Sequence, residues 1–199
     1  MIILLSNFRV GSSVFQREYS KKTGATYWIY DKNGKGGYLP YTAEYLHPSD
    51  GGYKQPHPKI NLYKVMPDQF KNDFKDFKKY FLDASSEIIY LVRKNLTEQI
   101  LSYAICHETK NWHPWQEKVN QRFKENYQYS FELDKQLYKH YETMILTNLH
   151  YQSIIYKDYP GKVSFLEDRF SKQIKYPNKV KIENEKQIHT DVDVEKYFK

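Results

Sequence analysis

Short segments rich in apolar residues are the feature that most constrains the fold of this chain. We expect one strand in each of four segments: Ile2–Leu5, Lys59–Met66, Glu87–Val92 and Gln152–Tyr156. Apolar runs without period-two alternation are typical of strands buried on both faces of a parallel sheet.

Between and beyond these runs, apolar residues recur at helical spacing. Helices are expected from Val14 to Thr23–Gly24, from Asp68 through a core stripe of Phe70, Phe74, Phe77 and Phe81, from the cap pair Asn95 and Glu98, over Phe131–Leu149, and from Pro160–Gly161 to Leu166. Strands that alternate with helices predict an α/β fold, with a three-layer parallel sheet and helices on both faces. In such sheets, ligands bind at the carboxyl ends of the strands.

Length indicates a single domain, residues 1–199, with a polar and loosely packed tail over 171–199. Its single cysteine and the lack of a membrane span predict a cytoplasmic protein. Lysine and arginine number 31 against 24 acidic residues, a formal charge of +7 that suits a phosphorylated ligand. The basic residues are spread along the chain, so nucleic acid is not a favoured partner. The lone Cys106 fits a reducing compartment, and no segment suggests a membrane partner. The sequence leaves the oligomeric state open.

A polar loop with small residues follows the first apolar run. Gly11 allows close approach of a ligand to the backbone, Ser12 and Ser13 offer hydroxyl groups, and Arg9 adds a permanent charge. A strand, a small-residue loop and a helix together present backbone N–H groups and a positive helix end to an anion. The alternative is a buried strand that turns into a serine-capped helix, because GxxxxGK[ST] is absent.

A second candidate anion site follows the run Glu87–Val92. Arg93 stands at the exit of that strand, and Ser102 falls about 10 Å along the next helix. An arginine at a strand end and a hydroxyl on the neighbouring helix can clamp one phosphate together. Two anion sites on one rim of the sheet match a nucleotide charged at its 5′ and 3′ positions. A structural ion pair for Arg93 and a surface hydroxyl for Ser102 are the alternatives.

Together these segments resemble the PAPS-dependent sulfotransferases, and their bacterial trehalose-type branch in particular. In that family, R/K-x-G-S/T-S/T binds the 5′-phosphosulfate of 3′-phosphoadenosine 5′-phosphosulfate, and Arg9-Val10-Gly11-Ser12-Ser13 matches it. A later strand–Arg–helix–Ser element binds the 3′-phosphate, and Arg93 and Ser102 match it. The resemblance implies a P-loop-like nucleotide-binding sulfotransferase fold over residues 2–158. It also implies sulfuryl transfer from this donor to a hydroxyl or amine acceptor, such as a carbohydrate or another small molecule.

The resemblance further implies roles for individual residues. Arg9 would stabilise the bridging oxygen that gains charge, while Ser12 and Ser13 hold the 5′-phosphate. Thr42–Tyr45 resembles a segment with a catalytic-type glutamate, which makes Glu44 the candidate base, with His47 and His57 as runners-up. An ordinary surface carboxylate is the alternative for Glu44.

Three looser matches complete the resemblance. Lys64 stands before Pro67 as in the family's Lys-x-x-x-Pro segment, although the histidine of that segment is missing, and is a third catalytic candidate. Trp112 closes a Thr-x-x-Trp pattern and is a candidate for the adenine, with core packing as its alternative. Ile155–Asp158 resembles the family's final strand. The aromatic, glycine-rich segment 25–58 holds the expected acceptor-binding loops.

Two other classes of function stay open. One is a non-catalytic module that binds RNA or another polyanion through basic charge and exposed tyrosines. The other is a nucleotide or nucleoside kinase-like enzyme, against which the missing P-loop lysine argues. No metal is expected, because His107 and His113 with Cys106 and Glu108 do not form a spaced ligand set. The absence of G-x-S-x-G gives no support to a serine hydrolase.

Overall fold

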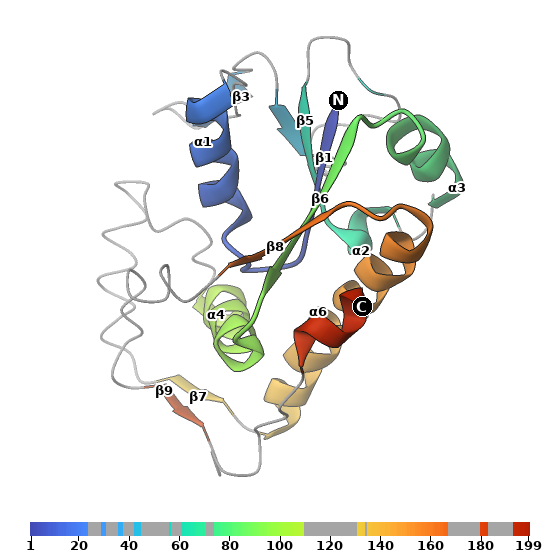
Figure 1. Ribbon diagram of the computed structural model, residues 1–199. Coiled ribbons are helices and arrows are strands. Elements are labelled where there is room, and N and C mark those ends of the chain that lie inside the picture. Colours follow the sequence, from blue (N-terminus) through green and yellow to red (C-terminus); the bar gives the residue numbers. More distant parts are fainter. Residues whose placement is uncertain are drawn as a thin grey trace.

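A five-stranded parallel sheet forms the centre of the protein (Figure 1). The structure, a computed structural model, describes residues 1–23, 29–30, 36–37, 42–44, 56, 61–70, 74–109, 131–133, 135–166, 180–182 and 193–199. The strand order is β4-β5-β1-β6-β8, with bounds Thr42–Glu44, Leu62–Val65, Ile2–Ser6, Glu87–Arg93 and Lys162–Leu166. This confirms the expected α/β architecture with a parallel sheet.

The three predicted strands β1, β5 and β6 lie side by side. β1 is central: its Leu5 is the register partner of Val65 in β5 and of Tyr90 in β6. All four residues of β5 are buried, as are all residues of β6 after Glu87. Continuous apolar runs therefore mark strands that are covered on both faces, as expected.

Alternate residues of these strands pack against different helices. Leu4 and Leu62 belong to a cluster with Phe15 and Tyr19 of α1 (Ser12–Thr23). Leu5 belongs to a second cluster, which includes Leu149 of α6 (Lys135–Asp158). Successive side chains of a strand point to opposite faces, so helices cover both faces of the sheet. Figure 1 shows α1 on one side of the strands and α3 and α6 on the other.

The phenylalanine stripe lies in three short helical pieces. They are α2 (Pro67–Phe70), α3 (Phe74–Phe77) and the π-helix η1 (Lys78–Leu82). Phe70, Phe77 and Phe81 are fully buried, and the rings of Phe70 and Phe77 stack 4.2 Å apart. Phe74 is 36% exposed. The stripe is therefore core packing at three of its four positions.

Two predictions near residue 155 are wrong. Residues 152–156 form no strand, because α6 continues to Asp158, and Ile155–Asp158 is thus not a final strand. The short helix expected after Pro160–Gly161 is instead β8, which pairs in parallel with β6. A short apolar run fits a buried helix segment as well as a strand, and here it continues the apolar face of α6. The helix expected over Phe131–Leu149 also starts later than predicted: residues Phe131–Leu133 form β7, and α6 begins at Lys135.

Gly161 explains why the chain can enter the sheet at β8. A Cβ atom at this position would lie 2.3 Å from the carbonyl oxygen of Ile88 in β6. Only glycine allows the two backbones to approach so closely.

The C-terminal residues pack against the core. The 3₁₀ helix η2 (Val194–Phe198) leaves Val194 3% and Phe198 8% exposed. The ring of Phe198 lies 5.3 Å from that of Tyr156. The expectation of a loosely packed tail is thus wrong for residues 193–199.

The remaining described strands form two small sheets. β2 (Ile29–Tyr30) pairs antiparallel with β3 (Gly36–Gly37), and β7 pairs in parallel with β9 (Val180–Ile182). Within the described ranges, no helix has both the length and the apolar character needed to cross a membrane.

Candidate functional site

The loop between β1 and α1 has an unusual backbone conformation. Gly11 has φ 75°, and Arg9 has φ 56°, which places a non-glycine residue in the left-handed region. The left-handed conformation costs a residue with a Cβ atom about 1–2 kcal/mol. Such outliers are retained where the surrounding structure holds them, and they cluster at functional sites.

Hydrogen bonds of two side-chain amides, Asn7 in the loop and Gln99 on a helix, hold this loop. Asn7 accepts a hydrogen bond from the Phe8 N–H at 2.7 Å and donates to the carbonyl oxygen of Ile145 in α6 at 2.8 Å. Gln99 of α4 (Leu96–Thr109) donates to the carbonyl oxygen of Phe8 at 2.6 Å. The loop is therefore fixed between α4 and α6 at the carboxyl ends of the strands.

The two predicted anion-binding segments meet directly. The Nε atom of Arg9 donates to the Oγ atom of Ser102 at 3.0 Å. Ser102 is 2% exposed, so its hydroxyl lies inside the protein beside the guanidinium. The structure thus brings together a cation from the first segment and a hydroxyl from the second.

Arg93 forms a structural ion pair, which was the alternative to a phosphate contact for this residue. Its Nη2 atom donates to Oε2 of Glu98 at 2.6 Å, and its Nη1 atom lies 3.5 Å from the carbonyl oxygen of Arg9. Asn95 accepts from the Glu98 N–H at 3.0 Å, which confirms the predicted cap of α4. The sequence indicated Glu98 only as a cap residue and did not identify it as the partner in the alternative ion pair of Arg93. Among the described residues, Ser102 therefore pairs with Arg9, and Arg93 pairs with Glu98.

The other residues expected to bind the nucleotide lie at the start of α1 and just before it. Ser12 is buried and Ser13 half-buried, directly after Val10, which is 1% exposed, and Gly11. The Phe15 N–H donates to the carbonyl oxygen of Gly11 at 3.0 Å, so the helical hydrogen bonds start there. The predicted order of strand, loop and helix is confirmed.

Glu44 and Lys64 are neighbours in the sheet. Glu44 is the last residue of β4, and its Cα register partner is Lys64 of β5. Lys64 is 8% exposed and is in turn the register partner of Leu4 in β1. The backbone thus places both candidates toward the carboxyl end of the sheet, two strands and one strand away from β1.

Several candidates lie outside the described residues. They are Trp112, His47, His57 and His113, together with most of the segment 25–58. The described part of the chain contains no group of three or more His, Cys, Asp or Glu residues that could hold a metal ion. His107, one of the residues weighed for a metal, has its Nδ1 atom 2.8 Å from the hydroxyl of Tyr141.

Two stacked aromatic rings lie next to Arg9. Phe8 stacks on Tyr103 of α4, with ring centroids 4.5 Å apart and planes 17° apart. Burial, and to a smaller extent the charge of Asp68, raises the pKa of Tyr103 to about 12.

Burial also raises the pKa of the Cys106 thiol, which the charge of Arg9 partly opposes. Because the thiolate is the nucleophilic form, Cys106 is an unreactive core residue.

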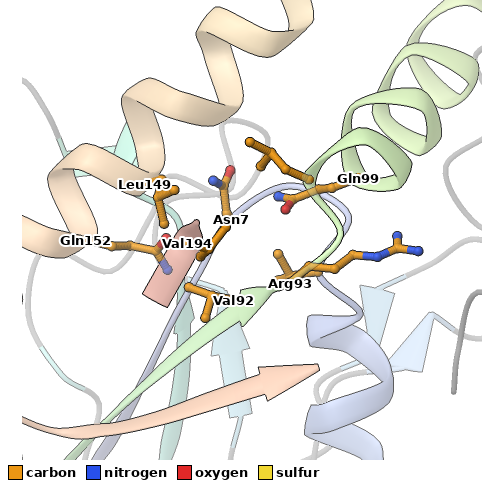
Figure 2. A pocket seen from close by; sticks show the side chains of 9 residues that line it. Asn7, Val92, Arg93, Gln99, Leu149, Gln152 and Val194 are labelled. Carbon is orange, nitrogen blue, oxygen red and sulfur yellow. The ribbon is translucent and has the colours of Figure 1, made fainter. Parts of the chain in front are cut away.

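A shallow recess, too narrow to hold a water molecule, lies beside the loop, between the ends of β1 and β6 (Figure 2). We call it the carboxyl-edge recess; its lining residues are Asn7, Val10, Val92, Arg93, Leu96, Gln99, Leu149, Gln152 and Val194. In Figure 2, Gln152 enters from α6 and Gln99 from α4, with Asn7 between them. Sequence reasoning missed these three amides, although Gln99 and Gln152 stand out as polar positions among apolar helix residues.

Comparison with known proteins adds no relative. No protein-family model, no curated protein and no solved structure matches the chain.

Proposed function

We propose that this protein is a sulfotransferase that uses 3′-phosphoadenosine 5′-phosphosulfate as donor and binds it at the carboxyl ends of β1 and β6. The observation that carries the proposal is the strained Arg9, hydrogen-bonded to Ser102. It joins a strand–loop–helix anion site to a buried hydroxyl on the next strand–helix unit. Such a pairing offers a cation, a hydroxyl and backbone N–H groups to the phosphates of one nucleotide.

In the proposed reaction, an acceptor oxygen attacks the sulfur in line. The bond between the sulfur and the bridging oxygen breaks, and adenosine 3′,5′-bisphosphate leaves. Negative charge grows on the bridging oxygen, so a guanidinium held beside it lowers the barrier more than it stabilises the bound donor. Arg9 takes this role, and its bond to Ser102 keeps the guanidinium in place.

The acceptor must lose a proton during this step. Glu44 is the proposed base, with Lys64 on the adjacent strand as a cation that stabilises the ionised carboxylate. Parallel pairing in register supports this choice, because it places the two residues next to each other in the backbone. The acceptor is a hydroxyl or amine, with a carbohydrate as the first class to screen.

Selective stabilisation by nucleotides tests the donor site. Adenosine 3′,5′-bisphosphate should raise the melting temperature more than ATP or 5′-AMP does, because a ligand that binds only the folded state stabilises it. Arg93→Ala should reduce the preference for the bisphosphate over 5′-AMP by about tenfold or more, since a charge-assisted hydrogen bond contributes about 1.5–3 kcal/mol. The ratio of the two affinities corrects for any effect of the lost Glu98 pair on folding.

Lys94→Ala is the matched control. Lys94 is the next cation along the chain, its side chain is 51% exposed, and it pairs with Glu195 of η2 at 2.8 Å. Its removal should leave the nucleotide preference unchanged. Equal loss of both nucleotides in Arg93→Ala would contradict the 3′-phosphate assignment. Binding of RNA or heparin that falls steeply with salt, with no response to the bisphosphate, would favour the polyanion-binding module instead.

A further inference from the structure

The carboxylate of Glu98 covers the guanidinium of Arg93. The side chain of Arg93 is 8% exposed and that of Glu98 is 29% exposed, and their Nη2 and Oε2 atoms lie 2.6 Å apart. The other terminal nitrogen of Arg93, Nη1, lies 3.5 Å from the carbonyl oxygen of Arg9. In Figure 2, the Arg93 side chain extends away from Gln152, so its charged end is distant from that amide. Glu98 is therefore the more exposed partner of a cation that the protein also contacts on another side.

Glu98 lies on the same face of α4 as Ser102. The two residues are four positions apart, which is about one turn, or about 6 Å along the helix axis. Glu98 contacts Arg93 and Ser102 contacts Arg9, so these two contacts are adjacent on α4. Glu98 also belongs to the first turn of α4, where negative charge is favoured. Its carboxylate thus has an arginine and a helix start as neighbours, which are surroundings that also suit a phosphate.

We propose that Glu98 is an internal competitor of the 3′-phosphate: its carboxylate pairs with Arg93 in the free protein and leaves when the nucleotide binds. This inference rests on the proposed function and concerns the regulation of the same site. A buried guanidinium without a partner is costly, so the exchange of one anion for another keeps Arg93 paired in both states. Partial exposure gives the Glu98 side chain a route into solvent, while Arg93 stays in place.

Competition of this kind acts only on ligands that carry a 3′-phosphate. Adenosine 3′,5′-bisphosphate has to break a charge-assisted hydrogen bond before it forms its own, whereas 5′-AMP leaves the ion pair intact. In the proposed reaction, the bisphosphate is also the product. The return of Glu98 to Arg93 therefore helps the product to leave after sulfuryl transfer.

Glu98→Gln tests the inference. The amide keeps the size of the side chain, and the cap of α4 is retained because it uses the backbone N–H of residue 98 and Oδ1 of Asn95. A neutral partner holds Arg93 less strongly and does not repel a phosphate. Calorimetry on the full chain should therefore show adenosine 3′,5′-bisphosphate binding about tenfold more tightly to this variant, with the affinity for 5′-AMP unchanged. The ratio of the two affinities within one variant remains informative even if the variant is less stable.

Glu195→Gln is the matched control. It removes the same charge from the neighbouring ion pair, in which Glu195, 38% exposed, contacts Lys94 at 2.8 Å. It should change neither affinity. If Glu98→Gln left binding of the bisphosphate unchanged or weakened it, while the unmodified protein still preferred the bisphosphate, Glu98 would be a structural partner of Arg93 and the inference alone would be overturned. Equal gains for both nucleotides would also overturn it, because they would reflect net charge. No binding of either nucleotide by any of the three proteins would overturn the proposed function as well.

Discussion

Arg9 combines a conformational cost with a position that the fold holds firmly. Its left-handed backbone lies between Asn7, which is bonded to α6, and Gly11, where the helical hydrogen bonds begin. A side chain in this place is stabilised by its bond to Ser102 and, in our proposal, by the phosphates of the donor. At residue 9, stability would therefore favour a residue that adopts the left-handed conformation without strain, whereas the proposed function requires the guanidinium group.

Arg9→Gly and Arg9→Ala should separate these requirements. Both remove the guanidinium and should weaken binding of adenosine 3′,5′-bisphosphate to the same extent. Only glycine relieves the left-handed strain, so Arg9→Gly should be more stable than Arg9→Ala by about 1 kcal/mol after the entropic cost of glycine. Urea unfolding of the two variants measures this difference. Equal stability would mean that residue 9 leaves the left-handed region when the arginine is absent.

At the level of elements, α4 and α6 meet through aromatic side chains next to the site. Tyr103 of α4 and Tyr141 of α6 pack edge to face, with ring centroids 5.4 Å apart, and Phe8 stacks on Tyr103 from the loop. The Tyr103 hydroxyl lies 3.9 Å from the sulfur of Met144, a weak acceptor. Because Tyr103 is buried among these groups, the folded protein favours its protonated, neutral form.

Alkaline pH should weaken the contact between these helices through Tyr103. Its pKa in the folded protein is raised from 10.0 to about 12, so the unfolded chain loses this proton first. The resulting stability is present below pH 10 and is lost as pH rises toward 12, up to about 2–3 kcal/mol. Tyr103→Phe cannot ionise, so its free energy of unfolding should fall less over this interval than that of the parent. Parallel urea titrations on both sides of the interval test this, and identical losses would remove Tyr103 as the cause.

At the level of the whole molecule, residues near both ends of the chain are part of the hydrophobic core. β1, at the N-terminus, is the central strand, while Val194 and Phe198, at the C-terminus, join the cluster that includes Leu5 and Tyr90. Val194 also lines the carboxyl-edge recess. The last residues are thus part of the folded unit and of one wall beside the candidate site.

Phe198→Ala should lower the free energy of unfolding by about 3–5 kcal/mol, as expected for loss of a buried phenylalanine. The reason is its position in the core, where its ring contacts those of Tyr90 and Tyr156. Lys199→Ala, at an exposed neighbour, is the control and should change stability by less than about 0.5 kcal/mol. If Phe198→Ala behaved like the control, residues 193–199 would be an unpacked tail after all.

The sequence by itself determined the local structure of the candidate site. The apolar runs at Ile2–Leu5 and Glu87–Val92, the glycine at position 11 and the cap pair Asn95–Glu98 each act within a few residues. Such features depend on backbone geometry and on burial of a whole strand, so periodicity and turn chemistry are enough to predict them.

Only the tertiary structure decided how α6 ends and which side chains meet. Residues 152–156 could form a strand or a helix by pattern alone, and packing of a 24-residue helix on the sheet selected the helix. The bond between Arg9 and Ser102 joins residues 93 positions apart, and it depends on β1 and β6 being neighbours. Pairing of that kind follows from strand order and from competition among nearby partners such as Glu98, which are properties of the folded molecule and not of any segment.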